Sequence, residues 1–190
     1  MILRKIVAAI ILLSVSHLVY ADSVNIQLGD DSVRLLYASE VFGGQFGPTD
    51  FELGGFFNED DTVAHASLVL RSDTIDNPFV AAIGGRFYYG DVGNATPTSA
   101  DVAAITFGLS VSFRPDGLSG LGVNAYYFIS PSVTSYLDAD SFREFGLTLD
   151  INVTEQVGFY VGYRDMTTNL DDGRDLQIDD SFIYGFVFRF

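Results

Sequence analysis

From residue 22 onward the chain alternates apolar side chains with small or polar ones, in one segment after another. Between Ala103 and Phe113, for example, every second residue is apolar and the residues in between are small or polar. Successive side chains in a β-strand point to opposite faces, so this period of two predicts strands with one apolar and one polar face. We find no sustained helical period of 3.6 residues after residue 21. The pattern therefore predicts an all-β protein.

Turn signals divide this pattern into ten expected strands. They lie near residues 24–28, 32–40, 50–58, 62–72, 79–90, 102–114, 118–129, 142–153, 156–166 and 177–190. The connections at 115–117 and 154–155 are tight, whereas those at 91–101, 130–141 and 167–176 are longer, and the two kinds alternate along the chain. The first strand is short for a membrane span, so eight strands is the alternative if the first hairpin stays outside a barrel.

Two architectures produce such strands. A soluble sandwich or lipocalin-like barrel turns its apolar face inward, whereas a transmembrane antiparallel up-and-down β-barrel turns it outward to lipid. Glycine is frequent on the small and polar face, which suits a narrow, crowded barrel interior. Aromatic side chains cluster at residues 87–89, 126–128 and 159–160, as expected of girdles at the membrane interfaces. Both features favour the membrane barrel.

The last expected strand gives the most specific signal. Aromatic residues occupy alternate positions up to the end of the sequence, at Phe182, Tyr184, Phe186, Phe188 and Phe190. A soluble edge strand that exposed five aromatic side chains would promote aggregation. The pattern resembles instead the assembly signal of Gram-negative outer-membrane barrels, and this resemblance implies insertion by the barrel assembly machinery. We therefore expect a multi-pass β-barrel in the cell outer membrane.

The first 21 residues have the pattern of a secretory signal peptide. Residues 1–5 are short and basic, residues 6–19 are mostly apolar, and Val19-Tyr20-Ala21 fits the cleavage site. The apolar run is shorter than the ~20 residues that a transmembrane helix needs. We expect a signal peptide at 1–21 and one outer-membrane β-barrel at 22–190.

Composition excludes several classes of function. The 190-residue chain has a net charge of −15, which argues against a nucleic-acid partner because phosphates require a basic surface. It contains no Cys, so disulfides, thiolate metal sites and thiol nucleophiles are excluded. No GxSxG, HExxH, Walker or dinucleotide-binding motif is present. We expect a monomer without a cofactor.

The polar faces of the expected strands carry charges of both signs. The charged side chains expected inside the barrel are Arg34, Glu40, Glu52, Arg71, Arg86, Glu144, Asp150, Arg164 and Arg189. Enclosed charges are costly unless they pair, and the planar guanidinium group suits such pairing. We interpret the set as a network of ion pairs that plugs a narrow lumen. A narrow channel for a small solute is the alternative.

The excess of negative charge lies in or beside the expected outer connections. These acidic groups are Asp30-Asp31, Glu59-Asp60-Asp61, Asp138 with Asp140, and Asp171-Asp172 with Asp175, Asp179 and Asp180. Hydrated loops use such residues for solubility alone. Carboxylates also bind calcium or magnesium, which can bridge a protein to anionic lipopolysaccharide. We expect at most weak divalent-cation binding, with outer-membrane lipid and lipopolysaccharide as partners.

Catalysis has one candidate pair of residues. His65 is the only His after residue 21, and Ser67 lies on the same face of its expected strand. Catalytic sites of this kind need a His oriented by Ser or acidic partners. Residues at i and i+2 share a face of any strand, however, and a single His inside a barrel is more often a hydrogen-bonding group. We therefore expect no enzymatic activity.

Two segments carry a resemblance to a known family. Residues 156–164, QVGFYVGYR, are similar to an x-V-x-A-G-Y-R strand of the YfaZ family of outer-membrane proteins. Residues 124–131, NAYYFISP, are similar to the E-Y-Y-Y-S-P segment of that family, with Asn124 in place of the acid. The resemblance implies a signal peptide followed by one small barrel, and it implies no established activity.

The sequence thus predicts a non-enzymatic outer-membrane barrel with a charge-plugged lumen and acidic outer loops, in a structural or surface-interaction role. Besides the narrow channel, a soluble periplasmic β-barrel that binds an apolar ligand is an alternative. The direction in which the apolar side chains point distinguishes the membrane barrel from the soluble one.

Overall fold

The computed structural model describes residues 22–72, 78–93, 99–115, 117 and 120–190. The signal peptide expected at residues 1–21 lies outside the described residues. Within the described ranges, no helix is long and apolar enough to cross a membrane.

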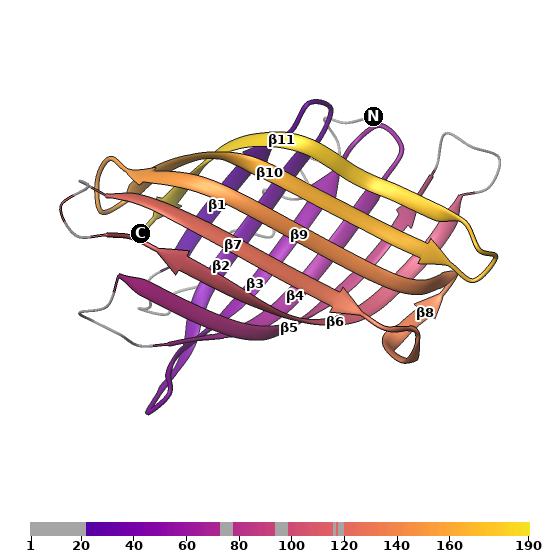
Figure 1. Ribbon diagram of the computed structural model, residues 1–190, viewed down its shortest axis with the longest axis horizontal. Coiled ribbons are helices and arrows are strands. Elements are labelled where there is room, and N and C mark those ends of the chain that lie inside the picture. Colours follow the sequence, from indigo (N-terminus) through magenta and orange to yellow (C-terminus); the bar gives the residue numbers. More distant parts are fainter. Residues whose placement is uncertain (1–21, 73–77, 94–98, 116, 118–119) are drawn as a thin grey trace.

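Ten long strands and one short strand form a single sheet in this part of the chain (Figure 1). They are β1 (Asp22–Leu28), β2 (Val33–Gly44), β3 (Gly47–Phe57), β4 (Thr62–Arg71), β5 (Phe79–Val92), β6 (Ala100–Phe113), β7 (Leu121–Ser130), β8 (Ser135–Leu137), β9 (Ala139–Asn152), β10 (Val157–Leu170) and β11 (Asp175–Arg189). Each long strand pairs antiparallel with the next long strand in the sequence, and β1 also pairs with β11, which closes the barrel. The expected ten-stranded antiparallel barrel is confirmed, and its short first strand belongs to it.

The seventh strand of the barrel is interrupted by a proline. After β7 ends, Pro131 and the 3₁₀ turn η2 (Ser132–Thr134) leave the sheet, and β8 then returns to pair with the beginning of β6. Proline has no backbone N–H and cannot continue the ladder of hydrogen bonds. Much of the connection expected at 130–141 is therefore taken up by η2, β8 and the start of β9.

The connection expected at 167–176 is shorter than predicted. β10 continues to Leu170 and β11 begins at Asp175, so only residues 171–174 join them. The residues beyond the apolar part of these strands are mostly polar, but a β-ladder uses backbone groups whatever the side chains are. The apolar alternation therefore marks the part of a strand that faces lipid and does not mark where the strand ends.

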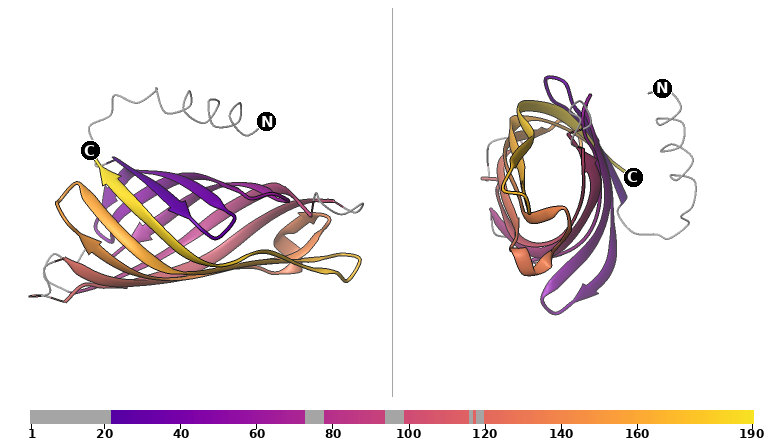
Figure 2. Two further views of the ribbon diagram at one scale, coloured as in Figure 1. Left: turned by 90° about the horizontal axis from the view of Figure 1, so that it is seen from above. Right: turned by 90° about the vertical axis from the view of Figure 1, so that its right-hand side faces the viewer.

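The barrel has two distinct ends. Asp22 and Phe190 exchange backbone hydrogen bonds of 3.2 and 2.9 Å, so the described chain begins and ends at the same place (Figure 2). We call this the terminus end, and it also carries the β6–β7 and β9–β10 connections that were expected to be tight. The opposite end, which we call the loop end, carries the connections from β1 to β2, β3 to β4, β5 to β6 and β10 to β11.

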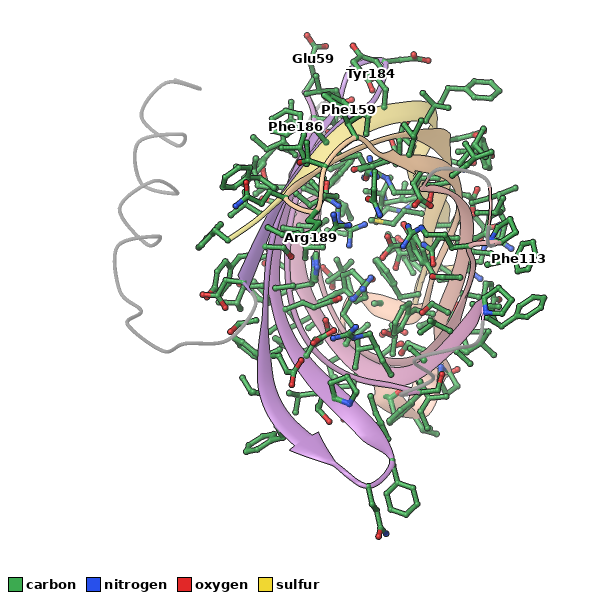
Figure 3. The ribbon with its side chains drawn as sticks, turned by 90° about the vertical axis from the view of Figure 1, so that its left-hand side faces the viewer. Glu59, Phe113, Phe159, Tyr184, Phe186 and Arg189 are labelled. Atoms are coloured by element: carbon green, nitrogen blue, oxygen red, sulfur yellow. The ribbon has the colours of Figure 1, made fainter. Side chains whose placement is uncertain are left out.

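The apolar faces of the strands point away from the barrel axis. Phe107, Leu147 and Phe186 have exposed fractions of 57%, 44% and 39%. Figure 3, which looks along the barrel from the terminus end, shows Phe159 and Phe186 directed outward from the ring of strands. The five alternating aromatic residues of β11 and the last position are all exposed. This is the arrangement of a membrane barrel and not of a soluble barrel with an apolar core.

The aromatic clusters expected at the membrane interfaces are split between the two faces of the barrel wall. Phe87, Tyr127 and Phe159 are exposed on the outside, whereas Tyr88 and Phe128 are buried in the interior. Consecutive residues of a strand point to opposite faces, so a run of aromatic residues cannot all belong to one girdle. The interpretation of the clusters as girdles is therefore wrong for their inward-facing members.

The polarity of the barrel is inverted at the loop end. The interior there holds one buried apolar cluster, which consists of Phe56, Val63, Tyr88, Val92, Ala100, Val102, Ala104, Ala139, Phe142, Met166, Leu170 and Ile178. On the outside, Arg143 lies 3.7 Å from Asp165, and more than half of the Arg143 side chain is exposed. An apolar inside and a charged outside are what a β-barrel in water requires. The loop end is therefore built like the end of a soluble barrel.

Leu147 lies near the middle of β9, and substituting it with a charged residue tests whether its side chain faces lipid. We expect Leu147→Arg to lower the free energy of unfolding in lipid vesicles by roughly 2–4 kcal/mol, the cost of a lipid-facing Arg at the bilayer midplane. Urea titration of the folded barrel in vesicles measures this change. Tyr136→Arg in the exposed strand β8 is the control and should change the free energy little. Equal effects of the two variants would contradict the placement.

Candidate functional site

A buried carboxylate, Glu144 of β9, forms the centre of a charged layer inside the barrel. Arg86 of β5 donates from Nη1 to Oε2 of Glu144 at 3.0 Å, and Arg34 of β2 forms an ion pair with Oε1. The Tyr126 hydroxyl donates to Oε1 at 2.9 Å, and the Tyr88 hydroxyl donates to Oε2. Glu144 is fully buried, and both guanidinium groups are more than nine-tenths buried. Strands from opposite parts of the sheet are thereby tied together across the lumen.

The charged layer continues toward β3 and β4. Arg86 also donates from Nη2 to Oε2 of Glu52 at 3.0 Å, and the Ser67 hydroxyl donates to the same oxygen at 2.6 Å. The guanidinium group of Arg86 lies 4.2 Å from the centre of the Phe128 ring, a cation–π distance. On the other side, Nη2 of Arg34 lies 3.3 Å from Nε2 of His65. Each charged side chain of the layer therefore has a partner of opposite charge inside the barrel, although the Nε atoms of Arg34 and Arg86 are buried without a hydrogen-bond partner among the described residues.

Glycines on the inner wall make room for the rings of this layer. A Cβ atom on Gly146 would lie 2.3 Å from Cε1 of Tyr126, and one on Gly54 would lie 2.1 Å from Cε1 of His65. Both distances are far below van der Waals contact, so only glycine allows the rings to lie flat against the neighbouring strand. This explains why glycine is frequent on the inward face, as the sequence pattern indicated.

A second buried ion pair lies nearer the loop end. Nε of Arg164 donates to Oδ2 of Asp179 at 2.6 Å, and its two other nitrogens bond to Gln27 and to the hydroxyl of Ser32, the latter at 3.3 Å. The guanidinium group also lies 4.9 Å from the centre of the Phe56 ring. Arg164 is fully buried and Asp179 nearly so. This cluster completes the charged layer beside the apolar cluster.

Asp179 was expected among the acidic residues in or beside the outer connections, and this placement is wrong. It falls inside the last expected strand, and in β11 its side chain points into the lumen, where it is buried beside Arg164. The inward direction of Asp179 can be predicted from the sequence, because every second residue of a strand shares a face. Ser181 and Arg189 lie an even number of residues away from Asp179, and both face inward. Parity also places Gln27, Tyr88 and Tyr126 inside, although none of them was singled out.

The remaining expected lumen charges lie toward the terminus end and are only partly buried. Arg71 bonds to Asp50, with Nη2 at 3.0 Å from Oδ1, and its nearest approach to Glu40 is 3.7 Å. Asp150 pairs with Arg114. Arg189 is not in an ion pair among the described residues; its Nη1 donates to the side-chain oxygen of Asn152 at 3.3 Å. Of the nine expected charges, the structure therefore brings Arg34, Glu52, Arg86 and Glu144 together in the charged layer. Arg71 and Glu40 also form an ion pair toward the terminus end.

A polar cavity separates these outer pairs from the charged layer. Its volume is about 250 Å³, and Asp50, Arg71 and Asn124 are among the residues that line it toward the terminus end. Arg34 and Arg86 line its inner part. Beyond them the lumen is filled by the apolar cluster of the loop end. The cavity is large enough to hold several water molecules.

His65 and Ser67 do not form a catalytic pair in this geometry. Ser67 donates to Glu52 and His65 contacts Arg34, and no hydrogen bond joins His65 to Ser67. Among the described residues, no group of three or more His, Asp or Glu side chains is placed to hold a metal ion.

The acidic groups at the loop end differ in their surroundings. Asp30, Asp31 and Asp171 are exposed. The carboxyl group of Asp61, in contrast, accepts hydrogen bonds of 2.8 Å from the side chain of Asn58 and from the backbone of Gly93. Burial raises the pKa of Asp61, and these hydrogen bonds oppose the rise. Asp61 therefore shapes its turn, whereas the exposed carboxylates are free to meet solvent or ions.

The fold and this interior define a closed ten-stranded barrel of the membrane type, apolar on the outside and charged within. The family described as "YfaZ precursor" matches residues 2–190. The chain therefore belongs to the YfaZ family, as the two motif-like segments predicted. No curated protein matches the sequence.

Two solved membrane proteins show a distant structural likeness to this chain. The outer membrane channel DcaP of Acinetobacter baumannii is 9% identical with a TM-score of 0.43, over 87% of this chain and 62% of that chain. A protein solved in a study of the in-meso crystallization of membrane proteins is 13% identical with a TM-score of 0.43, over 90% and 83% of the two chains. This chain thus spans less than two thirds of the DcaP chain, and likenesses at this level define no function.

The role of Glu144 can be tested against a matched carboxylate on the same face of β9. We expect Glu144→Gln to lower the free energy of unfolding by about 3–5 kcal/mol, because it leaves buried Arg34 without a counter-charge and leaves Arg86 with Glu52 alone. Asp150→Asn is the control, since its partner Arg114 is partly exposed and such pairs contribute less than about 1 kcal/mol. Urea titration in vesicles compares the two variants. A cost for Asp150→Asn as large as for Glu144→Gln would contradict the central role of Glu144.

Proposed function

We propose that this protein is a non-enzymatic integral outer-membrane β-barrel whose lumen is closed. The observation that carries the proposal is the position of Glu144, which is held across the lumen by two arginines and two tyrosine hydroxyls. The outward apolar side chains and the aromatic last strand support the location in the outer membrane, with the terminus end in the periplasm. Insertion by the barrel assembly machinery and a monomeric state belong to the same proposal.

Two barriers in series support a closed lumen. Separating one partner from a buried ion pair costs roughly 3–5 kcal/mol, so the charged layer is rarely open at equilibrium. Behind it, the apolar cluster at the loop end contains Phe56, Phe142 and Met166, each about 1% exposed. An ion that passed the first barrier would have to enter an apolar interior without hydrogen-bonding partners, which is costly for any charge.

A narrow channel for a small solute is the second candidate function. The polar cavity of about 250 Å³ favours it, because a solute entering from the terminus end would reach Arg34 and Arg86 directly. The soluble barrel with an apolar ligand has less support, because its apolar faces would have to point inward.

Conductance distinguishes the closed barrel from the channel. We expect no steady open current when the folded barrel is inserted into planar bilayers, because both barriers stay in place. The control for the measurement is Glu144→Ala, which removes the first barrier and should still leave the apolar cluster closed. A steady current from the unmodified protein would contradict the closed lumen and support the channel.

The surface-interaction role is proposed for the acidic turns of the loop end. Exposed carboxylates such as Asp30, Asp31 and Asp171 would bind divalent cations weakly and so bridge to lipopolysaccharide phosphates. Asp30 and Asp31 lie in the β1–β2 turn and Asp171 lies in the β10–β11 turn. Both turns are at the loop end, which faces the cell exterior if the terminus end is periplasmic.

Calcium binding tests this bridge. We expect calorimetric titration of the folded barrel with calcium chloride to show weak, millimolar binding, as exposed carboxylates without a built cage would give. The variant that combines Asp30→Asn, Asp31→Asn and Asp171→Asn should bind less calcium. The matched control is Asp172→Asn, because Asp172 is already bonded to Arg174 at 2.7 Å. An absence of heat at millimolar calcium would end the proposal of a cation bridge.

A further inference from the structure

The β2–β3 hairpin extends beyond its neighbours at the terminus end. β1 pairs with β2 only as far as Ser39, and β4 pairs with β3 only as far as Thr49. Residues 40–48 therefore form a two-stranded ribbon that has no strand on either side among the described residues. The register of the ribbon shifts between Glu40 and Phe42, and such a bulge adds twist and bends a hairpin.

This ribbon leaves the barrel sideways. Figure 1 shows the hairpin projecting from the wall at the terminus end, and Figure 3, along the barrel, shows it passing clear of the ring of strands. The ribbon therefore points into the space around the barrel and not into the lumen. For a barrel in a membrane, that space is the lipid surface of the leaflet at the terminus end.

The composition of the ribbon suits a lipid surface. No charged residue lies between Glu40 and Asp50, although the chain as a whole carries a net charge of −15. Phe42 and Phe46 have exposed fractions of 69% and 72%. Phe42 pairs with Thr49, which has the same outward direction as Leu53 on β3, and Phe46 lies in the turn at the tip of the ribbon. The turns at the loop end are acidic instead. Aromatic residues are favoured where headgroups meet acyl chains.

The backbone of the ribbon limits how deeply it can insert. Both of its edges carry backbone groups that no neighbouring strand satisfies, and such groups are costly in the hydrocarbon core. Pro48 removes one of these donors from the edge next to β4. The ribbon is therefore suited to the hydrated boundary of the membrane, where water still reaches its backbone and only the two rings enter the apolar region.

We propose that the β2–β3 ribbon is a membrane-surface anchor whose partner is the phospholipid of the leaflet at the terminus end. Phe42 and Phe46 insert into the boundary between headgroups and acyl chains, and they fix the depth and tilt of the barrel. The inference rests on the proposed membrane location. It goes beyond that location because a closed barrel can span a bilayer without such an extension.

A tryptophan reporter tests the anchor, because the chain contains no Trp. Phe46→Trp places a single fluorophore at the tip of the ribbon, and the full barrel is folded into phosphatidylcholine vesicles with plain or brominated acyl chains. We expect blue-shifted emission and the loss of about half of it in brominated vesicles, as for a ring that lies ~5–10 Å into the boundary.

Two matched reporters calibrate the result. Phe107→Trp, on the lipid-facing side of β6, should be quenched strongly by brominated chains, and this shows that the barrel is inserted. Val133→Trp, in the exposed turn η2 at the loop end, should be quenched by aqueous iodide and not by brominated lipid. The three reporters thus compare lipid, boundary and water in the same fold.

The possible outcomes separate the anchor from its alternatives. If Phe46→Trp behaves like Val133→Trp while Phe107→Trp is quenched by lipid, the barrel is inserted and the anchor is overturned. Shielding of Phe46→Trp that grows with protein concentration would assign the ribbon to a second copy of the chain and would equally overturn the lipid partner. If Phe107→Trp is not quenched by lipid either, the membrane location itself fails, and the anchor fails with it.

Discussion

The structure depends on a wall made of a single β-sheet, in which the side chain of each strand residue points either to the outside or to the lumen. Apart from the bulges, alternate residues of each strand face outward and inward, so the outer apolar band and the inner charged layer come from alternating positions of the same strands. In β9, Arg143 and Leu147 face outward, while Glu144 and Gly146 face inward. A charge in the middle of the lumen, such as Glu144 or Arg164, is cut off from bulk water and must find its partners inside the wall. The lumen network follows from this constraint.

The inversion of polarity toward the loop end follows from the same constraint. Lipid covers only ~25 Å of a membrane barrel, and the strands here continue beyond that band. Where the outside meets water, Arg143 and Asp165 face outward, and the inward positions are free to become apolar, as Phe142 and Met166 are. The residues that close the lumen at the loop end are therefore the core of a short water-exposed barrel that stands on the membrane-spanning part.

The sequence was sufficient for the strand number, the direction of the apolar faces and most of the enclosed charges, because each depends on a period of two. It was insufficient for the strand ends, because β10 and β11 continue beyond the part of the strand in which apolar residues alternate. Asp179 was grouped with the acidic residues of the outer connections, although it lies in the last expected strand and shares the inward face with Ser181. Its pairing with Arg164 appears only in the structure. The pairing of particular charges also depends on which strands face each other across the lumen, and this distance information is absent from a one-dimensional pattern.

The charged layer and the apolar cluster lie one behind the other inside the barrel, and this arrangement supports the proposal of a closed lumen. Glu144 forms ion pairs with Arg34 and Arg86 at once. Moving any one of these three side chains would leave a buried charge with fewer partners in a medium of low polarity. In a water-filled lumen, water molecules would hydrogen-bond to these charges, and one carboxylate would not have to pair with two arginines. The acidic turns of the loop end and the uncharged ribbon of the terminus end lie beyond the wall, so alternation does not constrain their residues. Surface interactions are therefore proposed for these two regions.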